Sequence, residues 1–265
     1  MVLVLHCSLV STTSRGSCCT DRVLCFIFSS NVLFIMSILK LPQSTTRLLN
    51  STTVIPSPLS LVKELVDNAI DANATNIEIS LSANTVDKIQ VRDNGHGINH
   101  EDYEALGRRS HTSKLRTFEE LQSKGGKTLG FRGDALASIN TSSKLTITTR
   151  TNQDKAAVFL AIKKDTGGVS DSKLVSGPVG TTVDVLDLFA SVPVRKQLAI
   201  KESKKAYKQI KQLLHTYALT RPHIRLSLKV SKGDKLSWSY ASGKGADVRE
   251  AVLQVFGTDL ASQCV

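Results

Sequence analysis

Residues 61–97 constrain the fold of this chain more than any other segment, because they combine a helical pattern, two strand patterns and a glycine-rich turn. Apolar residues recur at the spacing of one helix face from Leu61 to Ile70. Ser57 and Pro58 supply a helix start, since serine accepts hydrogen bonds from free N–H groups and proline suits the first turn. Asn73 follows the helix, where a residue that tolerates the left-handed conformation is expected.

Beyond this helix, apolar and polar residues alternate, which predicts strands with one buried face. Strands are expected over 77–81, 89–93, 145–149, 158–162, 181–186, 224–230 and 235–241. Helices are expected over 101–107, 116–123, 134–140, 200–219 and 247–257. Strands and helices are mixed rather than strictly alternating, so we predict an α/β fold of the α+β kind, a two-layer α/β sandwich, and not a doubly wound sheet.

The first helix carries two polar side chains one turn apart on the same face, Glu64 and Asn68. Mg²⁺ binds few protein oxygens beside phosphates and waters, and one asparagine amide oxygen suits that role. A nearby carboxylate could orient or deprotonate a water that attacks a phosphate. The same residues are also typical of a solvated helix face, and the helix alone does not separate the two interpretations.

A carboxylate followed by two glycines, Asp93, Gly95 and Gly97, ends the second strand. The glycines let the backbone come close to a flat ligand. Aspartate can accept a hydrogen bond from the exocyclic amine of adenine, which would select the base. Asp-Asn-Gly is equally a strong turn signal, so an ordinary turn is the alternative.

Glycines punctuate the polar segment 107–133, which is long for a loop in a compact domain. Within it, Thr112, Ser113 and Lys114 offer hydroxyls and a cation to phosphates. Its end, Gly-Phe-Arg-Gly at 130–133, runs into a predicted helix whose first N–H groups form an anion site. A lone glycine-rich loop is usually a flexible connection. All three elements in this order favour a nucleotide site.

The chain is basic, with 34 Lys and Arg against 23 Asp and Glu and a formal net charge of +11. Such an excess favours a polyanionic partner but does not fix a fold. Seven basic residues lie between 195 and 211, opposed only by Glu202. Part of this set shares one helix face, which suits a phosphate backbone with little sequence preference. A solvated basic face is the alternative.

Several motifs resemble those of the MutL mismatch-repair family. They are LVKELVDNAIDANAT at 61–75, IQVRDNGHGI at 89–98, HTSKL at 111–115, LGFRGDALASI at 129–139, PVGTTVDVLDLF at 178–189 and VPVRKQ at 192–197. The likeness runs from about Ile38 to the C-terminus. PMS-type eukaryotic subunits look closest, because residues 51–60 lack the Gly-Glu pair of most MutL proteins. The family shares its GHKL-type ATP-binding fold with type II topoisomerases, histidine kinases and heat-shock chaperones.

The resemblance implies a role for each matching residue. Glu64 would activate the hydrolytic water and Asn68 would bind Mg²⁺. Asp93 would bind the adenine of ATP, in a pocket shaped by Gly95 and Gly97. The other nucleotide-binding positions would be Thr112, Ser113 and Lys114 in the lid, Gly130, Phe131, Arg132 and Gly133 around the phosphates, and Thr181 beside the adenine. Asp134 departs from the glutamate of the family by one methylene, and His111 is displaced by one position and receives no role.

The resemblance also implies an ATP-switched DNA-repair protein that resides in the nucleus. ATP binding would close the lid and pair N-terminal domains around DNA, and hydrolysis would reopen them. Expected partners are double-stranded DNA without sequence preference, a second MutL-family subunit in a heterodimer, and mismatch-recognition proteins, but no membrane. The expected DNA-binding residues are Arg195, Lys196, Lys201, Lys204, Lys205 and Lys208. The alternatives are a nucleotide-binding interaction subunit with little or no turnover and a chaperone-like ATPase of the same fold.

The domain organisation follows from the same reading. Residues 1–35 are expected to be a disordered extension outside the family, with a cleaved targeting segment as the alternative. Residues 36–190 would form the ATP-binding domain. Residues 191–265 would form part of a ribosomal-protein-like β/α transducer domain that binds DNA. We expect the chain to be truncated there, and ATP hydrolysis by the chain alone to be weak or incomplete.

Overall fold

The computed structural model describes residues 40–112, 129–130, 133–231, 237–241, 243 and 245–262. The extension 1–35 and the helix expected over 116–123 lie outside these residues. Within them, one mixed sheet has the strand order β5-β4-β3-β6-β2-β1-β7-β8. The strands are β1 (Asn76–Leu81), β2 (Lys88–Asp93), β3 (Lys144–Arg150), β4 (Ala157–Ile162), β5 (Val169–Val175), β6 (Gly180–Leu186), β7 (Arg225–Val230) and β8 (Trp238–Tyr240).

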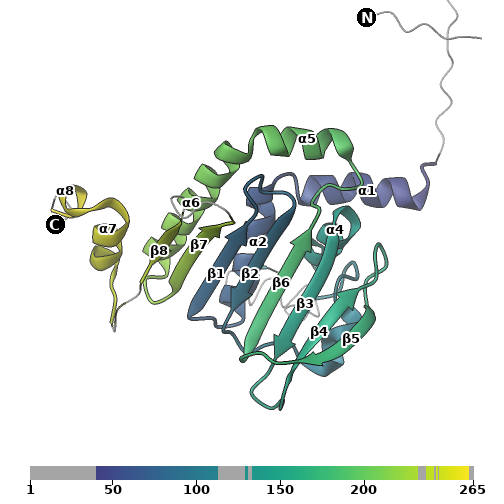
Figure 1. Ribbon diagram of the computed structural model, residues 1–265, viewed down its shortest axis with the longest axis horizontal. Helices are drawn as coiled ribbons and strands as arrows, with labels where there is room; N and C mark the ends of the chain where they lie inside the picture. The colour runs from purple at the N-terminus through teal and green to yellow at the C-terminus, as the bar shows by residue number, and fades with distance from the viewer. Residues whose placement is uncertain are drawn as a thin grey trace, which may run out of the picture. The chain divides into compact units, whose positions relative to one another are not determined.

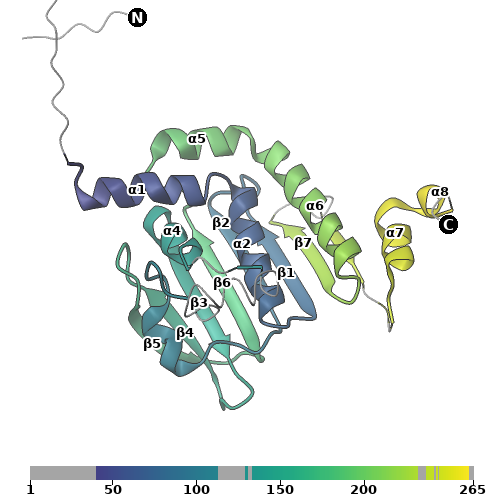
Figure 2. The same ribbon diagram turned by 180° about the vertical axis from the view of Figure 1, so that it is seen from behind.

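The helices over 58–71, 135–142 and 203–220 pack on one face of this sheet, as the two-layer prediction requires. The helical elements are α1 (Gln43–Val54), α2 (Pro58–Asp71), the 3₁₀ helix η1 (His100–Ala105), α4 (Ala135–Ser142), α5 (Pro193–Lys201), α6 (Ser203–Thr220), α7 (Val248–Phe256) and α8 (Thr258–Ala261). Strands lie in front of α2, α4 and α6 in Figure 1 and behind them in Figure 2. The mixed α/β fold is therefore confirmed.

Apolar and polar side chains alternate along the strands, and the helices cover the face that carries the apolar ones. Ile77, Ile79 and Leu81 of β1 are buried in the core under the helices. On β2, Lys88 and Arg92 point the other way and are exposed. The polar side chains thus remain in water while the apolar ones form the core, and this separation fixes the register of each strand.

Helix α2 begins where its sequence predicts. The hydroxyl of Ser57 accepts the N–H of Ser60, and the hydroxyl of Ser60 accepts the N–H of Ser57, so the two serines cap each other's backbone. Pro58 occupies the first turn. Asn73 follows the helix with φ 57°, the left-handed conformation expected for it. These contacts fix both ends of the helix that carries Glu64 and Asn68.

The second half of the chain continues the same sheet. Strand β7 pairs in parallel with β1, and its Leu226 and Leu228 join the core together with Ile210 of α6. The boundary expected between residues 190 and 191 stays a prediction about domains. The helix expected over 200–219 is α6, and a further helix that was not predicted, α5, precedes it and meets it at Glu202.

Besides α5 and the short helix α8, one longer helix and one strand were not predicted. Helix α1 is rich in serine and threonine and largely exposed, and strand β5 is an edge strand whose side chains are almost all exposed. Neither shows the periodic burial from which helices and strands are recognised. In the described part of the chain, no helix combines the length and the apolar character needed to cross a membrane.

Candidate functional site

The carboxylate of Asp93 lies at the end of β2 and is held there by backbone donors. Its Oδ1 accepts the N–H of Gly95 at 2.8 Å and the N–H of Thr181, on β6, at 3.3 Å. Its Oδ2 has no hydrogen-bond partner among the residues that the structure describes. Burial raises the pKa of Asp93, although both N–H donors oppose the shift. The arrangement leaves one carboxylate oxygen for a ligand.

The two glycines after Asp93 permit close backbone packing. A Cβ on Gly95 would lie 2.7 Å from the carbonyl oxygen of Ala72, at the end of α2. Gly97 has φ 77°, and a Cβ there would lie 2.3 Å from the carbonyl oxygen of Arg150. The N–H of His96 also donates to the Ala72 carbonyl at 3.1 Å. The Asp93 turn is thus fastened to the end of α2.

Glu64 and Asn68 lie on the same face of α2 as Asp71, because 64, 68 and 71 are separated by one turn each. All three are half-buried. The carboxylate of Asp71 accepts the N–H of Leu129 at 2.9 Å and of Gly130 at 3.0 Å. One helix face therefore brings Asn68 and Gly130 to the helix end that also holds the Asp93 turn.

The start of α4 borders this region. Gly133 packs against the backbone of His111, and the carboxylate of Asp134 accepts the N–H of Ser110 at 3.2 Å. No side chain in the described part of the chain caps the first N–H groups of α4. Thr112 is half-buried nearby in sequence. The predicted site residues Ser113, Lys114, Phe131 and Arg132 lie outside the described residues.

Buried hydroxyls on β3 and β6 complete the side of the site next to Asp93. Thr149 and Thr181 are both buried, with their hydroxyl oxygens 3.3 Å apart. The Thr149 hydroxyl also accepts the N–H of Ile98 at 2.9 Å. Sequence reasoning identified Thr181 but missed Thr149, although a threonine among the inward positions of a strand is a usable signal.

Asp71 and Asn94 were also missed. The amide oxygen of Asn94 accepts the N–H groups of Thr75 and Asn76 at 2.9 and 2.8 Å, which ties the Asp93 turn to the loop after α2. Asn94 therefore has a structural role inside the motif. Asp71 is recognisable only from its spacing of one turn after Asn68.

The donor set fits Mg²⁺ better than a metal held by protein alone. The described residues contain no group of three His, Cys, Asp or Glu side chains that could hold a metal ion. Mg²⁺ in nucleotide sites takes most of its oxygens from phosphates and waters, so the single amide oxygen of Asn68 is compatible with such a site.

The basic residues divide into two groups. Arg195 donates to the carbonyl of Thr52 in α1 at 2.7 Å and lies over the ring of Phe189, and Lys196 pairs with Asp187 at 3.1 Å. These two predicted DNA contacts are thus engaged within the protein. Lys201 is exposed at the end of α5. On α6 the exposed side chains are Lys204, Lys205 and Lys208, opposite the buried Ala206, Ile210, Leu214 and Ala218.

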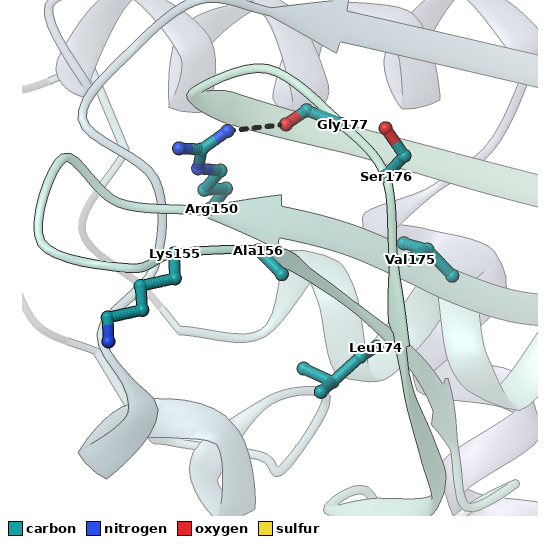
Figure 3. A pocket seen from close by; sticks show the side chains of 7 residues that line it. All are labelled: Arg150, Lys155, Ala156, Leu174, Val175, Ser176 and Gly177. Carbon is teal, nitrogen blue, oxygen red and sulfur yellow. Dashed lines mark hydrogen bonds between the residues drawn. The ribbon is translucent and has the colours of Figure 1, made fainter.

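A hollow of about 380 Å³ lies beside the edge strand β5 (Figure 3). It is lined by Arg150, Lys155, Ala156, Leu174, Val175, Ser176 and Gly177. The Arg150 guanidinium donates to the Gly177 carbonyl at 2.9 Å, which closes one side. None of the predicted site residues lines this hollow.

Comparison with known proteins identifies the class. Residues 57–178 match the family described as histidine kinase-, DNA gyrase B-, and HSP90-like ATPase. A solved structure of the Aquifex aeolicus MutL ATPase domain complexed with ADP is similar, with a TM-score of 0.59 and 29% identity, over 77% of this chain and 70% of that one. The N-terminal domain of a DNA repair protein gives a TM-score of 0.68 at 32% identity, over 83% of this chain and 63% of that one. The fold and these comparisons thus place the chain among ATPase domains of the GHKL class.

Curated relatives narrow the class to a family. The human PMS1 protein homolog 1 is 36% identical over 221 residues, which are 83% of this chain and 23% of the human protein. The MutL protein of Aquifex aeolicus is 35% identical over 218 residues, 82% of this chain and 49% of that protein. The chain belongs to the MutL family of DNA mismatch repair proteins. It spans between about a quarter and a half of the length of these relatives.

Proposed function

We propose that this chain binds ATP with Mg²⁺ and hydrolyses it, as the ATPase part of a mismatch-repair protein. The observation that carries the proposal is the Asp93 carboxylate, which is half-buried and fixed through Oδ1, with Oδ2 left for a donor. The exocyclic amine of adenine is a donor of the right kind. Asp71 supports the proposal, because it holds the backbone of Gly130 at the same end of α2.

The chemistry asks little of the protein beyond positioning and electrostatics. Glu64 would orient a water and take its proton as the water attacks the terminal phosphate. Asn68 would supply one oxygen to Mg²⁺, which neutralises phosphate charge when bound. The N–H groups at the start of α4 and of the Gly130 segment would contact phosphate oxygens. Thr112, Ser113, Lys114, Phe131 and Arg132 are proposed to cover them, and Thr181 to line the adenine side.

A substitution of Glu64 tests ATP hydrolysis separately from nucleotide binding. Glu64→Ala should bind a non-hydrolysable ATP analogue with nearly unchanged affinity and lose hydrolysis by roughly 10²–10⁴-fold, the range for removal of a general base. Glu78→Ala, which removes a carboxylate from β1 on the open face of the sheet, is the matched control and should keep both. If the unaltered protein binds ATP without turnover, the alternative of a nucleotide-binding interaction subunit replaces the ATPase proposal.

Double-stranded DNA is the proposed macromolecular partner, bound without sequence preference through α6. Lys204 and Lys205 stand in the first turn of α6, where the helix dipole disfavours cations, and Glu202 at the N-cap is the acidic residue next to them in sequence. This unfavourable placement is explained if phosphates approach the same helix end. Lys208 extends the exposed row, and Lys201 lies beside it on α5. Arg195 and Lys196 have partners within the protein and contribute less.

The remaining partners follow from the family. We infer that ATP closes the lid and pairs N-terminal domains around DNA, in a heterodimer of this PMS-type chain with a second MutL-family subunit. The heterodimer would act with mismatch-recognition proteins in the nucleus. A chaperone-like ATPase of the same fold would bind nucleotide but show no salt-sensitive binding to duplex DNA.

A further inference from the structure

A buried carboxylate outside the roles given above stands next to the nucleotide site. Asp67 lies on α2 one residue before Asn68 and three after Glu64, and it is only 2% exposed. A carboxylate in such a place is costly unless its oxygens are hydrogen-bonded and its charge is paired. Its partners therefore show what this position does.

Asp67 has two partners, and only one comes from its own helix. Lys63, one turn earlier on α2, contacts Oδ2 at 2.5 Å with its ammonium group, and its side chain is half exposed. The hydroxyl of Tyr217 on α6 donates to Oδ1. A pair within one helix needs no burial and adds little to stability. The Tyr217 hydrogen bond, by contrast, links this turn of α2 to another helix.

The surroundings of Tyr217 are consistent with a fixed contact. Helices α2 and α6 lie side by side on the same face of the sheet (Figure 2). Burial raises the pKa of Tyr217, and the hydrogen bond to Asp67 raises it further. The charge of Glu64 acts in the same direction, so the phenol also lies within the field of the proposed general base. Arg221 opposes the shift.

We propose that Tyr217 is a positioning residue for the nucleotide site, which acts by holding Asp67 and thereby the turn of α2 that presents Glu64 and Asn68. The ATP site then depends on a side chain of α6, the helix that carries the basic row. The inference rests on the proposed function, since it assigns a supporting residue to that site. A structural role alone would lower stability without changing nucleotide affinity.

The test compares Tyr217→Phe with Tyr240→Phe. Each substitution removes one hydrogen-bonded hydroxyl and keeps the ring, but the hydroxyl of Tyr240 donates to the carbonyl of Pro222, away from α2. With an ATP analogue and Mg²⁺, Tyr217→Phe should weaken affinity about three- to tenfold, within the range of one hydrogen bond to a charged acceptor. Tyr240→Phe should lower the melting temperature similarly and leave affinity unchanged. Unchanged affinity in Tyr217→Phe would overturn the inference.

Two additions make the result decisive. In an Asp67→Asn background the affinity loss from Tyr217→Phe should shrink, because the charged acceptor is gone, and a loss as large as before would also count against the inference. If the unaltered protein binds no nucleotide, the proposed function fails. Hydrogen exchange then tests separately whether Tyr217 holds the turn of α2. Amides over 64–71 should then lose protection in Tyr217→Phe but not in Tyr240→Phe, and equal protection in both would overturn the link.

Discussion

The carboxylate of Asp71 holds the backbone of Gly130, whose N–H donates to Oδ2 at 3.0 Å. The neighbouring oxygen, Oδ1, holds the N–H of Leu129 at 2.9 Å. One side chain of α2 thus fixes where the glycine-rich segment arrives at the helix that carries Asn68. This contact joins two of the three sequence elements that predicted a nucleotide site.

Removing this contact should weaken nucleotide binding more than it weakens the fold. Asp71→Ala loses both acceptors, and we expect about tenfold weaker binding of an ATP analogue, since hydrogen bonds to charged groups are worth roughly 1.5–3 kcal/mol. Asp71→Asn keeps one acceptor oxygen, so its affinity for the analogue should lie between those of Asp71→Ala and the unaltered protein. Fluorescence titration with the analogue measures the affinity of each variant and of the unaltered protein. Equal affinities in all three proteins would show that the contact plays no part in binding.

Gly97 should tolerate no side chain. Gly97→Ala combines a left-handed residue with a Cβ placed 2.3 Å from the Arg150 carbonyl oxygen. Gly245 has the same φ of 77°, but nothing lies within 4 Å of its added Cβ. We expect Gly245→Ala to cost about 1–2 kcal/mol from its conformation alone and Gly97→Ala clearly more. Chemical denaturation compares them, and similar losses would argue against close packing at Gly97.

The raised pKa of Tyr217 predicts a stability change at alkaline pH. The folded protein keeps the proton of Tyr217 above the ordinary tyrosine pKa of about 10, whereas the unfolded chain releases it. The unfolded state therefore binds fewer protons there, and this contribution to stability is complete below pH 10 and is lost as the pH rises. Between pH 9 and about 11, the free energy of unfolding should fall less steeply with pH in Tyr217→Phe than in the unaltered protein. The difference in slope should approach one proton. An unchanged slope would mean that the phenol titrates normally.

Binding to duplex DNA should depend on the exposed row of α6. Replacing Lys204, Lys205 and Lys208 with glutamine should lower affinity and reduce the salt slope by about 0.9 for each lost phosphate contact. The control replaces three other exposed lysines, Lys155, Lys163 and Lys164, and removes the same charge from a different surface. If both triple variants bind alike, net charge and not α6 governs the interaction.

Local signals predicted the nucleotide part of the fold well. The Ser57 cap, the left-handed Asn73 and the inward row of β1 all appear as expected, because each depends on residues close in sequence. Helix α1 was not foreseen, since its polar sequence is anchored by distant side chains. Arg109 donates to the carbonyl of Arg47 at 3.0 Å, and Arg195 donates to that of Thr52 at 2.7 Å.

The parts of the site that depend on contacts between residues far apart in the sequence could not be predicted. Asp93, Gly95 and Gly97 were recognisable because turn chemistry and close approach require those residue types. Asp67 was not, since an aspartate among the polar residues of an amphipathic helix looks solvated until Tyr217 is seen beside it. The basic residues show the converse, because charge alone does not reveal that Arg195 and Lys196 already have partners.

The most direct test of the account is the affinity of the unaltered protein and of Asp93→Asn for ATP and GTP analogues with Mg²⁺. If the Asp93 carboxylate accepts the exocyclic amine of adenine, the unaltered protein should prefer ATP. Asp93→Asn should then lose most of its ATP affinity, by roughly tenfold or more, with little change for GTP. Equal affinity of the two proteins for ATP would contradict the assignment of this site.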